Sequence, residues 1–239
     1  MKLAFVIPAY CAERSISPLV AELSALSSAL PSSTQTCVVV VDDGSTDATA
    51  ERAEHAGATV LRHPQNRGKG AALMSGFRWA LAAGARAAVT VDADGQHPPS
   101  EALALAVHPA PLDALLLGVR DLSSAGAPKK NRFSNGFSNA WMSFFAGQRL
   151  RDTQCGLRRY PLPETLELGL GGKGYELESE VILKAVRRGI RVVETEVHVI
   201  YPPEQERITH FHSVRDPARI VIRILHTAFT TRIERRAAP

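Results

Sequence analysis

Three features are scarce in this 239-residue chain, and each scarcity excludes a class of protein. The three cysteines (Cys11, Cys37, Cys155) have no Cys-x-x-Cys spacing, and their odd number argues against a disulfide framework. No run of about 18 apolar residues occurs, so no membrane-spanning helix is expected. The apolar start before Pro8 is too short for a secretory signal and lacks a cleavage site. We therefore expect a cytoplasmic protein, free or peripheral on a membrane.

The remaining composition is ordinary for a globular protein, with 45% hydrophobic and 22% charged residues. The net charge of +4 conceals an uneven distribution along the chain. The first hundred residues hold most of the functional-looking acids, whereas residues 129–159 and 207–236 are rich in Arg and Lys. This asymmetry suits a metal–nucleotide site beside a surface for an anionic partner, and no nucleic acid partner is expected.

Continuous runs of Val, Ile and Leu alternate with helical patterns along the first 120 residues. Strands are expected at 3–7, 36–41, 58–61, 87–91 and 113–119, and helices at 14–29, 47–55, 68–83 and 99–107. Such runs joined by short crossover helices predict a mostly parallel sheet covered on both faces. Beyond Arg120 the pattern predicts a helix at 131–147, a strand at 154–160, a helix at 175–188, a strand at 190–201 and a last helix from Asp216-Pro217.

The most informative motif is Asp92-Ala93-Asp94, directly after the apolar run at 87–91. Carboxylates at i and i+2 on an extended segment point the same way, and two like charges so close need something positive between them. A hard divalent cation that also grips a diphosphate meets this need, because such cations take oxygen ligands. In open α/β sheets, ligands bind at the carboxyl ends of strands. A solvated acidic turn is the alternative, since Asp94-Gly95 is a common turn pair.

Two more motifs follow strand ends. Asp42 and Asp43 come directly after the run at 38–41, where one of them could accept hydrogen bonds from a base N–H or ribose hydroxyls. Asp47 can instead cap the next helix. The turn at 66–70, Asn-Arg-Gly-Lys-Gly, precedes a helix whose N-terminus could bind phosphate, although it is neither a Walker A loop nor a GxGxxG motif.

Glu176 and Glu180 lie one turn apart on the helix expected at 175–188. Because Lys184 follows Glu180 at i+4, a surface ion pair explains Glu180 as well as a functional role does.

Four motifs occur in order at consecutive strand ends. They are Val-Ile-Pro-Ala-Tyr at 6–10 with Glu13, VVVVDDGSTD at 38–47, NRGKGAAL at 66–73 and VDADGQ at 91–96. The series resembles the family 2 glycosyltransferases of GT-A fold, over nearly the whole chain. The resemblance implies an α/β protein with a Rossmann-like, mostly parallel sheet, and a metal-dependent enzyme that moves a sugar from a nucleotide-sugar donor.

A later segment resembles one branch of that family. Asp-Thr-Gln-Cys-Gly-Leu-Arg-Arg-Tyr at 152–160 is similar to the Asp-x-x-x-x-Phe-Arg-x-Tyr segment of dolichyl- and polyprenyl-phosphate sugar synthases, and 174–180 and 192–197 resemble the same branch. After Tyr201 the chain departs from the branch, which carries an Arg and then Gly-x-Ser-Lys. Arg207 and His210 are the residues here that could substitute.

The resemblance implies roles for matching residues. Those expected to bind the nucleotide sugar are Pro8, Tyr10, Glu13, Asp42, Asp43, Arg67, Lys69, Asp92 and Asp94. Those expected to bind Mg²⁺ or Mn²⁺ at the diphosphate are Asp92, Asp94 and Gln96. Those expected to act in catalysis or on the acceptor are Asp94, Arg120, Arg132, Asp152, Arg158 and Glu180.

The acceptor decides which of these residues matter most. A lipid phosphate is already an anion, so it needs positioning by Arg120 and Arg132 and no general base. A hydroxyl acceptor needs a carboxylate to take its proton, and Asp152 or Glu180 is the candidate. In either case the metal neutralises charge on the leaving group, and attack from the opposite face inverts the anomeric carbon.

Three hypotheses of function follow. The leading one is transfer of a sugar from a nucleotide sugar to polyprenyl phosphate at a membrane surface. The second is a family 2 glycosyltransferase that uses a hydroxyl on another lipid or hydrophobic product. The third is a non-catalytic nucleotide- or lipid-binding module, which the presence of both carboxylates in Asp92-Ala93-Asp94 disfavours.

The expected organisation is one GT-A domain at 1–213, with a nucleotide-sugar half at about 1–119 and an acceptor half at about 120–213, followed by a C-terminal helix at 214–239. Apolar residues between 220 and 233 are flanked by Arg219, Arg223, Arg232, Arg235 and Arg236. A basic amphipathic helix of this kind predicts binding to the anionic inner face of a membrane. Packing of the helix on its own domain is the alternative.

Overall fold

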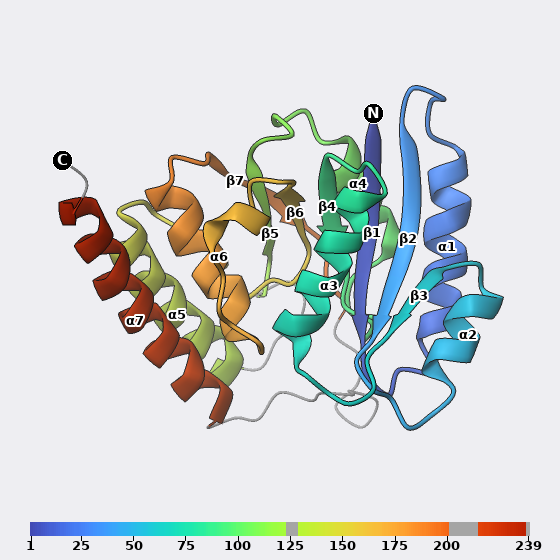
Figure 1. Cartoon of the computed structure of the whole chain (residues 1–239), viewed down its shortest axis with the longest axis horizontal. Coiled ribbons are helices and arrows are strands. Elements are labelled where there is room, and N and C mark those ends of the chain that lie inside the picture. The colour runs from blue at the N-terminus through green and yellow to red at the C-terminus, as the bar shows by residue number, and fades with distance from the viewer. Residues whose placement is uncertain (123–128, 201–214, 238–239) are drawn as a thin grey trace.

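The computed structural model describes residues 1–122, 129–200 and 215–237, and the side chains of 129–134, 215 and 231–237 lie outside the description. The strands are β1 (Lys2–Ala9), β2 (Gln35–Asp42), β3 (Thr59–Arg62), β4 (Ala87–Thr90), β5 (Leu115–Arg120), β6 (Arg158–Pro161) and β7 (Val192–Val197). The helices are α1 (Ile16–Ser28), α2 (Thr49–His55), α3 (Lys69–Ala82), α4 (Pro99–Val107), α5 (Lys129–Ala146), α6 (Glu176–Arg187) and α7 (Arg215–Ala237), with a short 3-10 helix η1 (Leu166–Leu168) (Figure 1).

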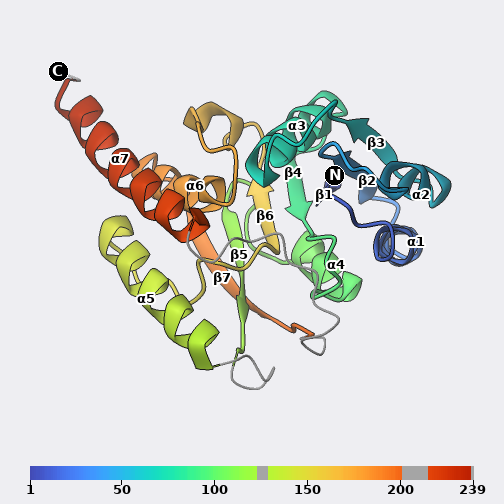
Figure 2. The same ribbon diagram turned by 90° about the horizontal axis from the view of Figure 1, so that it is seen from below.

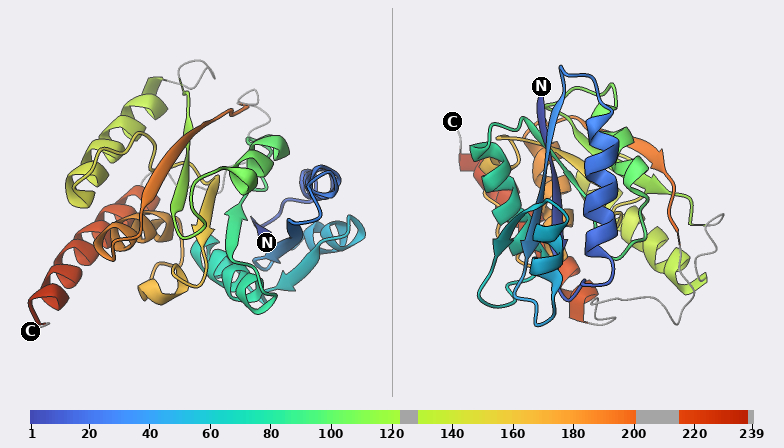
Figure 3. Two further views of the ribbon diagram at one scale, coloured as in Figure 1. Left: turned by 90° about the horizontal axis from the view of Figure 1, so that it is seen from above. Right: turned by 90° about the vertical axis from the view of Figure 1, so that its right-hand side faces the viewer.

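The seven strands form one sheet in the order β3-β2-β1-β4-β6-β5-β7. β6 runs antiparallel to both of its neighbours, and all other neighbouring strands are parallel. Helices cover both faces of the sheet (Figure 3). The predicted mostly parallel α/β architecture is therefore present, and the antiparallel direction of β6 is the feature that the sequence did not predict.

Alternate residues of the central strands enter two hydrophobic cores, one on each face of the sheet. Leu3, Phe5 and Ile7 of β1 pack in the core that α1 and α4 cover. Ala4 and Val6 pack in the core that α3 and α6 cover. This burial on both faces is the physical reason for the continuous apolar runs.

The register of the sheet brings the ends of β1, β2 and β4 to one edge. Asp42 pairs with Ala9, and Thr90 pairs with Val6. The acidic motifs that follow β2 and β4 consequently lie at the same edge, where open α/β sheets bind their ligands.

The last helix packs on the domain. Ile224, Thr227 and Ala228 of α7 are buried, and the guanidinium of Arg187 on α6 donates to the backbone carbonyls of Thr227 and Ala228 at 2.8 and 3.1 Å. Figure 2 shows α5, α6 and α7 grouped at one end of the molecule, far from α1 and α2. The packed arrangement is thus seen, while contact of the helix with a membrane stays a prediction.

The other side of α7 carries exposed apolar side chains. Ile222 is 67% exposed and Phe229 66% exposed, and Phe144 on α5 is 78% exposed. Within the described residues, no helix is long and apolar enough to cross a membrane.

Candidate active site

Asp43 is buried and orders the turn that leads into α3. Its carboxylate accepts hydrogen bonds from the backbone N–H groups of Arg67 and Gly68 at 3.0 and 2.7 Å. Its Oδ1 lies 2.6 Å from Nδ1 of His63, whose Nε2 lies 3.0 Å from Oγ of Ser75. The side chain of Arg67 is exposed. A direct contact of Asp43 with the nucleoside stays a prediction.

The start of α3 is closed by another part of the chain. The N–H of Ala71 donates to the carbonyl of Lys173 at 3.0 Å. Gly68 has φ +95°, and a Cβ there would lie 2.5 Å from the same carbonyl oxygen. Only glycine therefore fits, and its close neighbour in this structure is the 173–174 backbone.

The remaining donor-side residues lie around the ends of β1 and β2. Pro8 is inside β1 opposite Val41, and Tyr10 follows that strand. Asp42 is buried and accepts a hydrogen bond from the N–H of Ser45 at 3.1 Å. The structure thus brings these predicted residues together at the edge where β4 also ends.

Two further acids hold the chain before α2. The carboxylate of Glu13 accepts from the N–H of Ala48 at 3.3 Å, and Asp47 accepts from the N–H of Thr49 at 3.1 Å. The N-cap of α2 is Ala48, so Asp47 lies one residue before the capping position that the sequence predicted for it, although it contacts the first residue of α2. Its hydrogen bond from the Thr49 hydroxyl helps to lower the pKa of the carboxyl group, against the opposing effect of burial.

Lys69 lies between two carboxylates. Its Nζ is 2.7 Å from Oδ1 of Asp92 and 3.3 Å from the carboxylate of Glu178, and it lies 5.5 Å from the centroid of the Tyr175 ring. Burial disfavours the charged form of Lys69, but the two carboxylates outweigh it and raise the pKa of the ammonium. Burial likewise opposes ionisation of Asp92, and the Lys69 charge outweighs it and lowers the pKa of Asp92.

Asp94 differs from Asp92 in its surroundings. Its Oδ1 accepts a hydrogen bond from the N–H of Gln96 at 3.0 Å. Asp94 is exposed on one side, but the surrounding protein partly desolvates its carboxyl group. This desolvation and the charge of Asp92 raise the pKa of Asp94 to about 6. The pair therefore calls for additional positive charge beyond that of Lys69.

The donor set fits a hard divalent cation. Asp92, Asp94 and the amide oxygen of Gln96 are oxygen ligands of the kind that Mg²⁺ and Mn²⁺ take. Among the described residues, no group of three or more His, Cys, Asp and Glu side chains is placed to hold an ion. Mg²⁺ commonly binds through one or two carboxylates, water and substrate phosphates, so this set is sufficient when a diphosphate supplies the rest.

On the acceptor side, Arg120 and Asp152 form a two-point pair. The guanidinium donates from Nε to Oδ2 at 2.7 Å and from Nη2 to Oδ1 at 3.1 Å. Asp152 is 1% exposed, and burial would raise the pKa of its carboxyl, but the hydrogen bonds and charge of Arg120 outweigh it and lower the pKa. Arg132 lies in α5, and its side chain is outside the description.

Arg158 is fully buried and holds backbone carbonyls. It donates from Nε to Cys155 at 2.7 Å, from Nη1 to Glu178 at 2.8 Å and from Nη2 to Thr153 at 2.8 Å. In this structure Arg158 joins the 153–155 segment to α6, and its contact with the acceptor stays a prediction.

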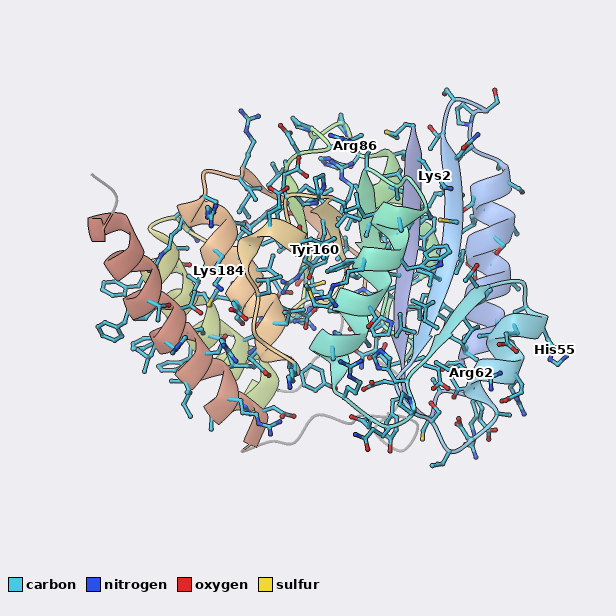
Figure 4. The ribbon with its side chains drawn as sticks, viewed as in Figure 1. Lys2, His55, Arg62, Arg86, Tyr160 and Lys184 are labelled. Atoms are coloured by element: carbon cyan, nitrogen blue, oxygen red, sulfur yellow. The ribbon has the colours of Figure 1, made fainter. Side chains whose placement is uncertain are left out.

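Glu180 is also buried, with 2% of its side chain exposed. It accepts hydrogen bonds from the N–H groups of Gly171 and Gly172, the shortest at 2.8 Å. Nζ of Lys184, one turn later on α6 and labelled in Figure 4, lies 2.9 Å from its Oε1. Nε of Arg223 on α7 lies 3.9 Å from its Oε2. The ion pair expected from the spacing is present, and Glu180 fixes the loop before α6.

Three residues of this region were not among the predictions. Glu178 pairs with Lys69, and Gly156 approaches Asp92 so closely that a Cβ would lie 2.3 Å from its Oδ2. Asn139 on α5 accepts from the N–H of Thr153 at 2.8 Å and so holds the acceptor segment. The resemblances of 152–160 and 174–180 marked the segments that contain Gly156 and Glu178 but did not single out either residue, and no pattern in the sequence pointed to Asn139.

Comparison with known proteins decides the family. The model of the family described as glycosyl transferase family 2 matches residues 4–158. The chain belongs to glycosyl transferase family 2. The match includes every donor-side motif, from the end of β1 to the pair after β4, and it confirms the family that the motifs predicted.

Two relatives carry names from the predicted branch. An undecaprenyl-phosphate mannosyltransferase of Micrococcus luteus is 29% identical over 208 residues, covering 82% of this chain and 83% of the relative. A UDP-N-acetylglucosamine–dolichyl-phosphate N-acetylglucosaminyltransferase of Methanococcus voltae is 28% identical over 221 residues, covering 82% of this chain and 84% of the relative. The resemblance to polyprenyl-phosphate sugar synthases is thereby confirmed.

A solved structure supports the fold. Glucosyl-3-phosphoglycerate synthase from Mycobacterium tuberculosis, in complex with Mn²⁺ and UDP-glucose, superposes with a TM-score of 0.69. The two proteins are 19% identical, and the match covers 96% of this chain and 78% of the other. The predicted GT-A fold is confirmed.

Proposed function

We propose that this glycosyltransferase moves a sugar from a nucleoside diphosphate sugar to the phosphate of a polyprenyl-type lipid, with inversion at the anomeric carbon. The observation that carries the proposal is that Asp152 and Glu180, the two carboxylates predicted as general bases, are both already bound by other groups of the protein. Asp152 is bound at two points by Arg120, and Glu180 is held by two backbone N–H groups and Lys184. Neither is poised to take a proton, which suits an acceptor that is already an anion.

The donor half of the proposal rests on the edge formed by β1, β2 and β4. Asp92, Asp94 and Gln96 would hold Mg²⁺ or Mn²⁺, which supplies positive charge to the diphosphate leaving group. Lys69 adds a cation from the start of α3. The related fold of glucosyl-3-phosphoglycerate synthase has been solved with Mn²⁺ and UDP-glucose and with Mg²⁺ and UDP, which supports a nucleotide-sugar donor here.

The acceptor half rests on Arg120 and on the names of the relatives. Arg120 is held by Asp152 through Nε and Nη2, and its positive charge helps to lower the pKa of Asp92. A guanidinium fork matches phosphate geometry. Both relatives described above are named for transfer to a lipid phosphate, undecaprenyl phosphate in one and dolichyl phosphate in the other.

A lipid acceptor requires access to a membrane surface, and exposed apolar side chains offer one. Val221, Ile222 and Phe229 on α7 and Phe137 and Phe144 on α5 are exposed. Arg219, three residues before Ile222 on α7, is exposed as well. We propose that the protein binds peripherally to anionic lipid through α7, with α5 contributing.

The test is a panel of nucleotide sugars incubated with the full chain, Mg²⁺ or Mn²⁺ and membrane lipid extract. Mass spectrometry of the lipid fraction should show one new species whose mass equals that of polyprenyl phosphate plus one glycosyl residue (the sugar less one water), with the nucleoside diphosphate released. A product in which the sugar is attached to a lipid alcohol would support the hydroxyl-acceptor hypothesis instead. Binding of nucleotide with no product from any lipid would support the non-catalytic module.

A further inference from the structure

Lys69 joins three elements at the donor site. It is the first residue of α3, its ammonium contacts Asp92 just beyond β4 at 2.7 Å, and it contacts Glu178 in the first turn of α6 at 3.3 Å. The side chain of Lys69 is 14% exposed, so these contacts are poorly screened by solvent.

The two carboxylates around Lys69 differ in what can reach them. The side chain of Asp92 is 23% exposed, and it belongs to the pair proposed to bind a divalent cation. The side chain of Glu178 is 9% exposed, and its backbone carbonyl is fixed by Arg158. A cation arriving at Asp92 therefore competes with the ammonium, while Glu178 stays in place beside it.

We propose that Lys69 is an internal counter-cation of the donor site. In the metal-free protein its ammonium neutralises Asp92, and when a divalent cation binds Asp92 the ammonium is retained by Glu178 within the site. Glu178 is then a positioning residue that acts through Lys69. The inference rests on the proposed metal and diphosphate site and names the two residues that set its charge balance.

The first consequence is that one substitution at Lys69 should change two affinities in opposite directions, that for Mn²⁺ and that for a nucleoside diphosphate. Lys69→Met should bind Mn²⁺ alone more tightly, by roughly tenfold, because the competing ammonium is gone. The same variant should bind a nucleoside diphosphate more weakly at saturating Mn²⁺, because a cation that faces the diphosphate is lost. Damage to the fold would weaken both.

The second consequence concerns Glu178. In Glu178→Gln, Lys69 is left with Asp92 as its carboxylate partner, so Mn²⁺ alone should bind more weakly. If the negative charge of Glu178 instead attracted Mn²⁺ directly, Glu178→Gln would weaken Mn²⁺ binding equally with and without Lys69. Action through Lys69 predicts that Glu178→Gln changes Mn²⁺ affinity by less than about twofold in the Lys69→Met background, a coupling that a double-mutant cycle measures.

The experiment is electron paramagnetic resonance of free Mn²⁺ during titration of the full chain, for wild type, both single variants and the double variant. Lys2→Met, at the start of β1 and so at the end of that strand away from the site (Figure 4), is the matched control for Lys69→Met. Glu22→Gln, at an exposed residue of α1, is the control for Glu178→Gln. Circular dichroism melting checks that each variant is folded, and Lys69→Gln replaces Lys69→Met if the latter unfolds. Calorimetry with UDP and with GDP at saturating Mn²⁺ gives the nucleotide arm.

Tighter Mn²⁺ binding by Lys69→Met, together with coupling between the two substitutions, supports the inference. A folded Lys69→Met that binds Mn²⁺ no more tightly than wild type overturns it, as does an equal effect of Glu178→Gln in both backgrounds. Failure of every variant and of wild type to bind Mn²⁺, with or without nucleotide, overturns the proposed metal site as well, so the two failures are distinguishable.

Discussion

Asp92 and Asp94 are two residues apart but hold their protons differently. Lys69 neutralises Asp92 directly, whereas desolvation by the surrounding protein and the neighbouring charge of Asp92 raise the pKa of Asp94 to about 6, although Asp94 is exposed on one side. The carboxyl of Asp94 is therefore the member of the pair whose ionised form most needs a further positive charge.

Asp94→Asn should reduce sugar transfer by roughly a hundredfold or more, because one charged ligand of the metal is lost. The fold should remain intact, since Asp94 lies at the solvent edge of the site. Turnover with Mg²⁺ or Mn²⁺ and circular dichroism melting measure the two effects. Full turnover of wild type in excess chelator would contradict the metal role.

Asp152 should instead stabilise the fold. It is buried, and removing one partner of a buried ion pair leaves Arg120 uncompensated, so Asp152→Asn should lower the free energy of unfolding by about 3 kcal/mol at pH 7.

The pH dependence of this effect has a definite sign. The pKa of Asp152 lies below its ordinary value of 3.8 in the folded chain, so its ionised form stabilises the fold above pH 3.8 and the stabilisation is lost as pH falls through the folded value. The difference between wild type and Asp152→Asn should therefore shrink below about pH 4. Urea unfolding at several pH values measures it, with Asp113→Asn, outside the site, as the control. A difference that stays constant into acid would contradict the assigned pair.

Among the elements, α7 has one face packed on the domain and one exposed face, and truncation of the helix would remove both at once. Ile224, Thr227 and Ala228 pack against the domain, so cutting the chain after Pro217 would remove buried contacts together with any lipid-binding face. Substitutions confined to the exposed face test membrane binding without disturbing the packed face.

The double variant Ile222→Ser with Phe229→Ser should bind anionic vesicles roughly tenfold more weakly or worse, because two large side chains no longer enter the lipid. Binding of wild type should also weaken with salt, since the basic residues act within a Debye length of the surface. Vesicle sedimentation measures both, and Val107→Ser, at an apolar residue on α4 that is half-exposed, is the control. Equal binding by the double variant and wild type would favour α7 as a purely structural helix.

For the whole molecule, the strands and motifs that depend on short stretches of sequence could be predicted before the structure was known. Burial on both faces makes the central strands continuous apolar runs, so β1, β2 and β4 and the acids beyond them could be placed before the structure. The end of the helix predicted at 175–188 is also close to that of α6, and Gly189, one residue beyond the C-cap Arg188, has φ +75°, which favours glycine at a helix end.

What depends on distant contacts could not be predicted. Glu178 meets Lys69 across 109 residues of sequence, and nothing in the spacing of the three acids on α6 distinguishes it from Glu176 and Glu180. The direction of β6 was equally hidden, because its four residues, Arg-Arg-Tyr-Pro, carry no pattern that distinguishes a parallel from an antiparallel strand. The buried engagement of Arg158 with backbone carbonyls follows from that packing, and a motif match does not report it.

The central claim is that the acceptor is a lipid phosphate. The most direct measurement compares polyprenyl phosphate with the polyprenol of the same chain length, using the full chain, Mg²⁺ or Mn²⁺ and the donor that the nucleotide-sugar panel identifies. The account predicts transfer of labelled sugar to polyprenyl phosphate and no transfer to polyprenol, because the site offers Arg120 to position an anion and no poised base to activate a hydroxyl. Transfer to polyprenol at a rate equal to or above that for polyprenyl phosphate would contradict it.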